Sequence, residues 1–309
     1  MNALVVGCLG QDGSYLTEHL KARGVAVYGL GRQGLHLPDG TLEPDVSIGN
    51  ILLELRPERI FHLAAYHHSA EEMMRDDGEI MRRSVEVHVL GLLAFLEAMH
   101  IHSLESRLFY AASSHVFGTP RQTPQDENTP MDALCPYGIT KAAGVQLCRM
   151  YRHRHRLYCS VGFLYNHESP RRRSHFLSRK IVQAAVAIHR GEKRQLVLGN
   201  LEAQVDWGYA PEYVDAMVRI LELDRPDDFI IASGSLHRVR DFVAEVFDQV
   251  GLDWRDHVSV DPSVLKKQEL PGTKVGDYSR LHRETGWAPT TNLARLAAIL
   301  VQAELEQDI

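Results

Sequence analysis

A glycine-rich loop placed directly after the first apolar run constrains the fold of this chain most strongly. Residues 3–7 (ALVVG) form that run, and the loop Gly7-Cys8-Leu9-Gly10-Gln11-Asp12-Gly13 continues from it. Apolar residues then recur at helical spacing over 14–23, and a second apolar run follows at 25–30. This order predicts a βαβ unit whose glycines let a pyrophosphate approach the N-terminus of the helix. A sharp turn without a ligand is the structural alternative.

The alternation of strands and helices continues beyond this unit. Strand-like segments at 60–65, 108–114 and 158–165 alternate with helix-like segments at 47–56, 85–99 and 137–156. Such alternation predicts an α/β fold of Rossmann type, with a doubly wound and mostly parallel sheet. We expect residues 1–165 to form this dinucleotide-binding domain, with a later contribution from about 205–233. Residues 166–309 would form mainly a smaller C-terminal α/β domain that binds the substrate.

Composition excludes several classes of protein. The 309 residues include 34 basic and 40 acidic side chains, and the resulting net charge of −6 argues against a duplex-binding surface. The longest uninterrupted apolar runs have about ten residues, which is too short to cross a membrane. The chain starts without a signal-peptide pattern, and its four cysteines show no CxxC spacing. We expect a cytoplasmic protein with no metal site and no nucleic-acid or membrane partner.

The end of the second strand indicates which dinucleotide binds. An acidic residue at this point would bind the ribose hydroxyls of NAD, but the sequence Gly29-Leu30-Gly31-Arg32-Gln33 contains none. Arg32 can pair with a 2′-phosphate, which favours NADP and makes NAD the less favoured cofactor. The alternative is a solvated arginine without this role.

Tyr137 and Lys141 form a YxxxK pair at the start of a predicted helix. The i, i+4 spacing places both side chains on one face, where the lysine ammonium would lower the tyrosine pKa. Tyr137 would then act as a base toward a substrate hydroxyl. Ser113, at the end of the preceding strand, could donate a hydrogen bond to the same hydroxyl. A surface pair on the helix is the alternative.

Together these features resemble the extended short-chain dehydrogenase/reductase superfamily. Longer segments resemble the GDP-mannose 4,6-dehydratase family within it, namely GQDGSYL (10–16), NHESPRR (166–172), SRKI (178–181), LGNL (198–201) and DWG (206–208). The resemblance covers nearly the whole chain. It implies a GDP-linked mannose-type sugar as substrate and a homodimer or homotetramer.

The resemblance also implies roles for individual residues. Ser113, Tyr137 and Lys141 would be catalytic. The cofactor would contact Gly7, Gly10, Gln11, Asp12, Gly13, Arg32, Asp45, Val46, Leu63, Ala64, Ala65, Lys141, His167 and Arg172. The substrate would contact Ser114, Asn166, Lys180 and Lys266, the last in place of the family's pyrophosphate-binding arginine.

His115 departs from the family pattern, which has glutamate there as the base for sugar carbon 5. In the family's reaction, carbon 4 is oxidised by NADP⁺, the carbon 5 proton is removed, water leaves from carbon 6 and the hydride returns there. Histidine can be a neutral base at pH 7, so His115 permits a dehydratase acting on GDP-mannose or GDP-manno-heptose. The alternative is a reductase of a 4-keto-6-deoxy sugar or a carbon 4 epimerase, for which Ser113, Tyr137 and Lys141 suffice. A non-catalytic nucleotide-sugar-binding protein is a third possibility.

Overall fold

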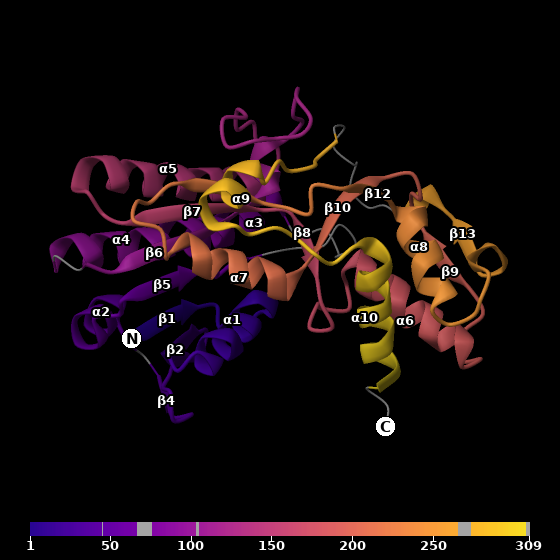
Figure 1. Ribbon diagram of the computed structural model, residues 1–309, viewed down its shortest axis with the longest axis horizontal. Helices are drawn as coiled ribbons and strands as arrows, with labels where there is room; N and C mark the ends of the chain where they lie inside the picture. The colour runs from indigo at the N-terminus through magenta and orange to yellow at the C-terminus, as the bar shows by residue number, and fades with distance from the viewer. Residues whose placement is uncertain (45, 67–75, 103–104, 265–272, 307–309) are drawn as a thin grey trace.

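The computed structural model describes residues 1–44, 46–66, 76–102, 105–264 and 273–306. An eight-stranded sheet forms the larger part of the molecule (Figure 1), with the order β11-β7-β6-β5-β1-β2-β3-β4. Its strands are β1 (Asn2–Val6), β2 (Ala26–Gly31), β3 (Gly34–His36), β4 (Leu42–Glu43), β5 (Arg59–His62), β6 (Arg107–Ser113), β7 (Cys159–Leu164) and β11 (Asp228–Ile231). The six strands from β11 to β2 are parallel, which confirms the predicted Rossmann-type fold.

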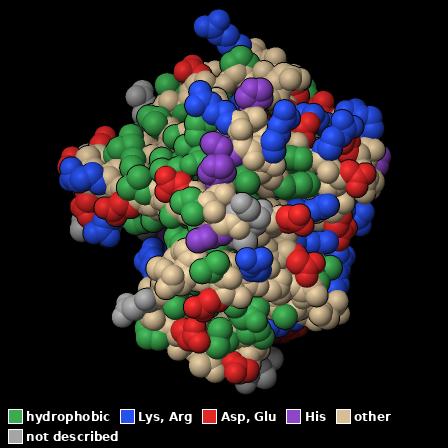
Figure 2. All heavy atoms as spheres, turned by 90° about the vertical axis from the view of Figure 1, so that its left-hand side faces the viewer, with side chains coloured by type: hydrophobic (Ala, Val, Ile, Leu, Met, Phe, Trp, Pro, Cys, Tyr) green, Lys and Arg blue, Asp and Glu red, His purple; other side chains and the backbone are tan. Residues whose placement is uncertain are grey.

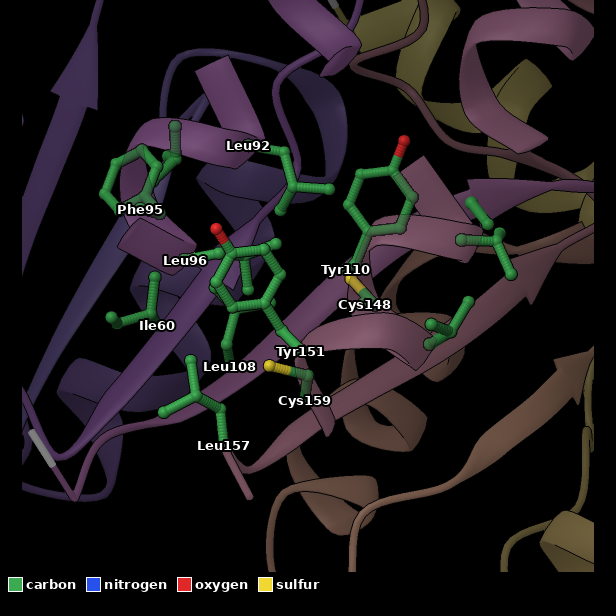
Figure 3. Packing of buried hydrophobic residues seen from close by; sticks show 14 of the residues in the cluster. Ile60, Leu92, Phe95, Leu96, Leu108, Tyr110, Cys148, Tyr151, Leu157 and Cys159 are labelled. Atoms are coloured by element: carbon green, nitrogen blue, oxygen red, sulfur yellow. The ribbon is translucent and has the colours of Figure 1, made fainter. Parts of the chain in front are cut away.

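Helices cover both faces of this sheet, and each face has its own apolar core. One face carries α2 (Ile48–Leu55), α4 (Gly91–Ile101) and α5 (Pro136–His155), whose side chains interleave with those of β5, β6 and β7 (Figure 3). The other face carries α1 (Gln11–Ala22), α7 (Ala210–Ile220) and α9 (Ser279–Thr285). α9 was not predicted from the sequence, because its seven residues are too few to show a helical period.

The sheet extends beyond β2 through a hairpin that the sequence did not predict. Gly31 pairs with Gly34 across the two-residue turn Arg32-Gln33, and β3 and β4 run antiparallel to their neighbours. Gly34 has φ +130°, which a residue with a Cβ rarely adopts. A Cβ at this position would also overlap the Glu43 carbonyl oxygen of the neighbouring strand. The turn places Arg32 at the edge of the sheet.

α3 (Asp77–Val85), a π-helical turn (Glu86–Leu90) and α4 form one continuous helix. By length and composition alone, Asp77–Ile101 could cross a membrane, which the length of uninterrupted apolar runs did not indicate. The expectation that no helix spans a membrane stays a prediction. A count of uninterrupted apolar runs does not detect such a helix, because its mean hydropathy can be high although polar residues interrupt the apolar ones. A core helix of a soluble protein passes the same test, and Leu92, Phe95 and Met99 of this helix are buried against the sheet.

In the described residues, the smaller part of the molecule contains two short sheets and three α-helices. Its strands are β8 (Asn166–Glu168), β9 (Leu196–Leu198), β10 (Gln204–Tyr209), β12 (Leu236–Arg238) and β13 (Val258–Val260). α6 (Leu177–His189), α8 (Val239–Asp248) and α10 (Leu293–Glu306) pack together around a third apolar core. The chain returns to the large sheet as α7, β11 and α9. The exact domain boundary at residues 165 and 166 remains a prediction.

The two parts meet at the carboxyl ends of the parallel strands. In Figure 1 the parallel strands point from the side on which the N-terminus lies toward the sheet of β8, β10 and β12. The opposite end is the face in Figure 2, on which several histidine side chains lie. Ligands of open α/β sheets bind outside the carboxyl ends of the strands, so the site is expected between the two parts.

Candidate active site

The glycine loop after β1 forms a close-fitting turn into α1. Gly7 has φ +89°, and a Cβ on it would lie 2.9 Å from the backbone nitrogen of Ala64. Gly10 is the N-cap of α1, and within the described chain no side chain caps this helix. Its first N–H groups are therefore available to an anion, and they favour negative charge. These features fit a dinucleotide pyrophosphate at this point.

Gly13 provides a direct test of this loop. A Cβ at Gly13 would overlap the Gly7 carbonyl oxygen and lie 2.7 Å from Cys8 Cα, so the backbone would have to move. We expect Gly13→Ala to cost about 1–3 kcal/mol of stability and to weaken dinucleotide binding at least tenfold. Thermal unfolding and calorimetric titration with NADP⁺ would measure both. Gly49→Ala is the matched control, since a Cβ there meets no atom within 4 Å. Unchanged binding in Gly13→Ala would contradict this assignment of the loop.

Asp12 and His167, both predicted to contact the cofactor, form an ion pair in the structure. His167 Nε2 is 3.0 Å from each carboxylate oxygen of Asp12, and His167 Nδ1 is 2.7 Å from the Tyr165 carbonyl oxygen. Burial opposes the charge on each partner. Their mutual attraction is stronger, so the pKa of Asp12 is lowered and that of His167 is raised. The pair ties the glycine loop to β8.

Gln11 and Arg172 complete this side of the site. Gln11 Nε2 donates to the His167 carbonyl oxygen at 3.1 Å, and the Ser169 hydroxyl donates to Gln11 Oε1 at 2.8 Å. Arg172 pairs with Glu168 at 3.3 Å, and its guanidinium lies 3.7 Å from the centre of the Phe176 ring. The NHESPRR segment thus contacts the glycine loop, although the two are about 155 residues apart in the sequence.

Tyr137, Ser113 and Lys141 lie together, as predicted. Ser113 ends β6 and is hydrogen-bonded to Tyr137, which lies in the first turn of α5. Lys141 is 1% exposed, and its ammonium lies 5.9 Å from the centre of the Tyr137 ring. It donates a 2.7 Å hydrogen bond to the Ala111 carbonyl oxygen. Two adjacent elements, β6 and α5, therefore build this cluster.

The expected lowering of the tyrosine pKa does not hold for the chain by itself. Burial raises the pKa of Tyr137 to about 12, and the Ser113 hydrogen bond offsets only part of this effect. Burial also lowers the pKa of Lys141 to about 7, so the lysine is only partly charged at neutral pH. The YxxxK pair therefore supplies less positive charge than the sequence suggested. A cationic cofactor ring would favour the tyrosinate further.

His115 lies against the other side of the tyrosine. Its ring meets the Tyr137 ring edge to face, with centroids 5.7 Å apart and planes at 89°. Burial lowers the pKa of His115 to about 4, and the nearby Lys274 charge contributes to this effect. Imidazole is thus the neutral, proton-accepting form at pH 7. Lys274 was not predicted from the sequence, because no local motif marks it.

The segment that carries Lys274 is held firmly against the large domain. Gln125 receives a hydrogen bond from the Val275 nitrogen at 3.1 Å and donates from its backbone to the Val275 carbonyl oxygen at 2.9 Å. The Gly276 nitrogen donates to the buried carboxylate of Asp206 at 3.1 Å. These bonds bring a residue near the C-terminus beside the catalytic cluster.

The remaining predicted residues occupy varied positions. Leu63 and Ala64 follow β5 and pack against Gly7, while Ala65 is exposed and Val46 contacts the first core. Ser114 is buried beside His115, Asn166 is exposed on β8, and Lys180 lies half-buried on α6. Arg32 is exposed at the hairpin turn. Asp45 and Lys266 lie outside the described residues.

Comparison with known proteins agrees with this arrangement. A family model described as GDP-mannose 4,6 dehydratase matches residues 4–300. The chain belongs to the GDP-mannose 4,6-dehydratase family. GDP-mannose 4,6 dehydratase 1 of Arabidopsis thaliana is 35% identical over 98% of this chain and 90% of its own length. The human GDP-mannose 4,6 dehydratase is 32% identical over 98% of this chain and 91% of its own length. Members of this family are lyases, and the chain shares that enzyme class.

Solved structures with lower identity share the fold of this family member. RMD from Pseudomonas aeruginosa, complexed with NADPH, superposes with a TM-score of 0.82 at 20% identity and covers 98% of both chains. dTDP-glucose 4,6-dehydratase from Bacillus anthracis, in complex with NAD, has a TM-score of 0.80 at 17% identity, covering all of this chain and 97% of its own. Each of these two neighbours was solved with a nicotinamide dinucleotide bound.

Proposed function

We propose that this chain is an NADP-dependent 4,6-dehydratase acting on a GDP-mannose-type sugar, GDP-mannose or GDP-manno-heptose. The observation that carries the proposal is the position of His115, whose ring lies against Tyr137 within the Ser113–Tyr137–Lys141 cluster. Tyr137 would accept the proton of the carbon 4 hydroxyl, and His115 would accept the proton of carbon 5. Family membership supports the sugar class, because the curated relatives are named as GDP-mannose dehydratases.

The residues divide the proton transfers between them. Ser113 orients the carbon 4 hydroxyl, and Tyr137 accepts its proton. The bound nicotinamide supplies a hydride acceptor and later a hydride donor. His115 then takes the proton from carbon 5, which the ketone at carbon 4 has made acidic. The resulting imidazolium would donate this proton to the carbon 6 hydroxyl, which leaves as water. Return of the hydride to carbon 6 and addition of a solvent proton to carbon 5 would complete the 4-keto-6-deoxy sugar.

The chemical basis for this substitution is that His115 can accept a proton at neutral pH. Burial lowers its pKa to about 4, so the imidazole is neutral at pH 7, and the carboxylate that the family pattern places there could accept the same proton. The conjugate acid of His115 could then protonate a leaving hydroxyl. The two groups differ in charge, since proton uptake makes the imidazole cationic.

Arg32 supports NADP as the cofactor. The hairpin turn holds it immediately after β2, the position at which Rossmann folds bind the ribose 2′ substituent, and Gly31 supplies no carboxylate. Asn166 and Lys180 would face the guanosine diphosphate. We also propose a cytoplasmic homodimer or homotetramer without nucleic-acid or membrane partners. Exposed Leu90, Ile101, Ile139 and Met150 on the long helix and α5 support self-association.

The reductase or carbon 4 epimerase is the second candidate. It needs only the Ser113–Tyr137–Lys141 cluster, and the substitution of histidine for the family's carboxylate at position 115 favours it. In such an enzyme His115 would contact the sugar without moving the carbon 5 proton. A nucleotide-sugar-binding protein without activity is disfavoured by the intact cluster.

A single assay separates these functions. Purified protein with NADP⁺ is incubated with GDP-mannose or GDP-manno-heptose in deuterated water, and the products are weighed by mass spectrometry. A dehydratase loses one water and gains one deuterium at carbon 5. Absence of water loss from both sugars, with reduction of a GDP-4-keto-6-deoxy sugar by NADPH, would assign the reductase instead.

A further inference from the structure

His88 is a fully buried polar residue to which neither the sequence nor the proposed reaction assigns a role. It lies in the π-helical turn Glu86–Leu90 within the long helix. Its Nε2 lies 2.9 Å from the backbone nitrogen of Tyr66, and its Nδ1 lies 2.8 Å from the hydroxyl oxygen of Thr140. π-helical turns inside helices occur frequently at functional sites.

The two partners fix the tautomer of this imidazole. The backbone N–H of Tyr66 can only donate, so Nε2 must accept and the ring proton lies on Nδ1. Nδ1 therefore donates to the Thr140 hydroxyl, which in turn donates to the Pro136 carbonyl oxygen at 2.8 Å. Protonation of Nε2 would break the bond to Tyr66, so His88 acts as a neutral connector.

The hydrogen bonds of His88 connect the segment beside the glycine loop with α5, the helix that carries Tyr137. Tyr66 follows Leu63 and Ala64, which pack against the glycine loop and border the dinucleotide site. Thr140 and Pro136 belong to the first turns of α5, the helix that carries Tyr137. The His88 ring also contacts the Tyr137 ring edge to face, with centroids 5.3 Å apart and planes at 88°. Tyr137 therefore contacts two imidazole rings, those of His88 and His115.

We propose that His88 is a positioning residue that fixes the Tyr137 hydroxyl relative to the dinucleotide site, through its bonds to Thr140 and Tyr66. The proposal builds on the catalytic role of Tyr137 but does not depend on the sugar. The ring contact restricts the tyrosine side chain, while the Thr140 bond holds the backbone turn from which it projects. Displacements of about 1 Å in such groups can cost roughly 10²-fold in rate.

Three variants separate the parts of this connection. Thr140→Val removes the hydroxyl with little change of shape, while Thr140→Ser keeps it and is the matched control. His88→Phe keeps a ring against Tyr137 but loses both hydrogen bonds. The readout needs no sugar. In the complex with NADP⁺, ¹³Cζ-tyrosine NMR follows ionisation of Tyr137, whose signal is assigned with Tyr137→Phe. Arg172, Asp12 and Cys135, which also act on the charge of Tyr137, remain unchanged in all variants.

Thr140→Val and His88→Phe should raise the midpoint of Tyr137 ionisation by about one pH unit, because a displaced tyrosine loses the Ser113 hydrogen bond that favours its anion. Thr140→Ser should titrate like the wild type. A purely structural role would lower the thermal unfolding temperature but leave this midpoint unchanged, and that result would overturn the proposal. Because no sugar is present, failure of the dehydratase assay would not alter either outcome.

Discussion

Replacing His115 by glutamine is expected to slow water elimination by roughly 10²–10⁴-fold, the usual contribution of one general acid–base group. Glutamine keeps much of the size and polarity of histidine but cannot exchange a proton near neutral pH. The protein should therefore still bind the nucleotide sugar, and Tyr137 should still accept the carbon 4 proton. Mass spectrometry would follow water loss and deuterium entry at carbon 5, both of which should decline together.

His115→Glu provides the matched control for this prediction. A carboxylate restores a group that can accept a proton, so elimination should recover at least tenfold relative to His115→Gln. Once carbon 4 is oxidised, the elimination step itself should persist from neutral pH down to about pH 5 and be lost as the pH approaches 4, because protonation then removes the base. Water loss by His115→Gln within a few-fold of the wild-type rate would exclude His115 as the base.

Removing the Tyr137 hydroxyl has the second largest expected effect. Tyr137→Phe should reduce removal of the carbon 4 hydroxyl proton by roughly 10²–10⁴-fold. The phenyl ring would keep its contacts with His88 and His115, so we expect the fold to remain intact. Sugar turnover and thermal unfolding measure the two effects. Tyr110→Phe is the control, since its hydroxyl is buried in the core and has no hydrogen-bond partner among the described residues.

The pH dependence of the first step should follow from the same residue. Burial raises the pKa of Tyr137 toward 12, so the protonated form dominates at pH 7 and the rate should rise with pH. Bound dinucleotide should move this rise to lower pH, because its cationic ring stabilises the tyrosinate. A rate independent of pH between 6 and 9, with Tyr137→Phe fully active, would require another base.

Short sequence patterns correctly predicted those groups of site residues that lie on a single helix or in a single loop. Tyr137 and Lys141 share a helix face because of their spacing, and Gly13 is required because α1 starts four residues after Gly7 and a Cβ on Gly13 would overlap the Gly7 carbonyl oxygen. The glycine loop and the parallel strands could likewise be predicted from residues close together in the sequence. Each such pattern has a physical cause that acts over fewer than ten residues, which is why a single sequence displays it.

The remaining parts depend on contacts between distant residues. Lys274 reaches His115 because Gln125 and Asp206 hold its segment, and no local spacing encodes that approach. His88 looked like one polar residue within an apolar helix, and only its bonds to Tyr66 and Thr140 reveal a role. The pKa of Tyr137 was misjudged for the same reason, since the burial that dominates it arises from tertiary packing.

The return of the chain to its first sheet has a consequence for synthesis on the ribosome. β7 ends at Leu164, but its second neighbour β11 begins only at Asp228, and Trp287 of the second core follows later still. A nascent chain that has emerged as far as β7 therefore exposes the unpaired edge of a strand that is fully buried in the folded protein, a known route to aggregation. At a translation rate of about 5–20 residues per second, this exposure lasts several seconds. Slow codons between β7 and β11 would lengthen it, and a chaperone that shields strand edges would be needed during that interval.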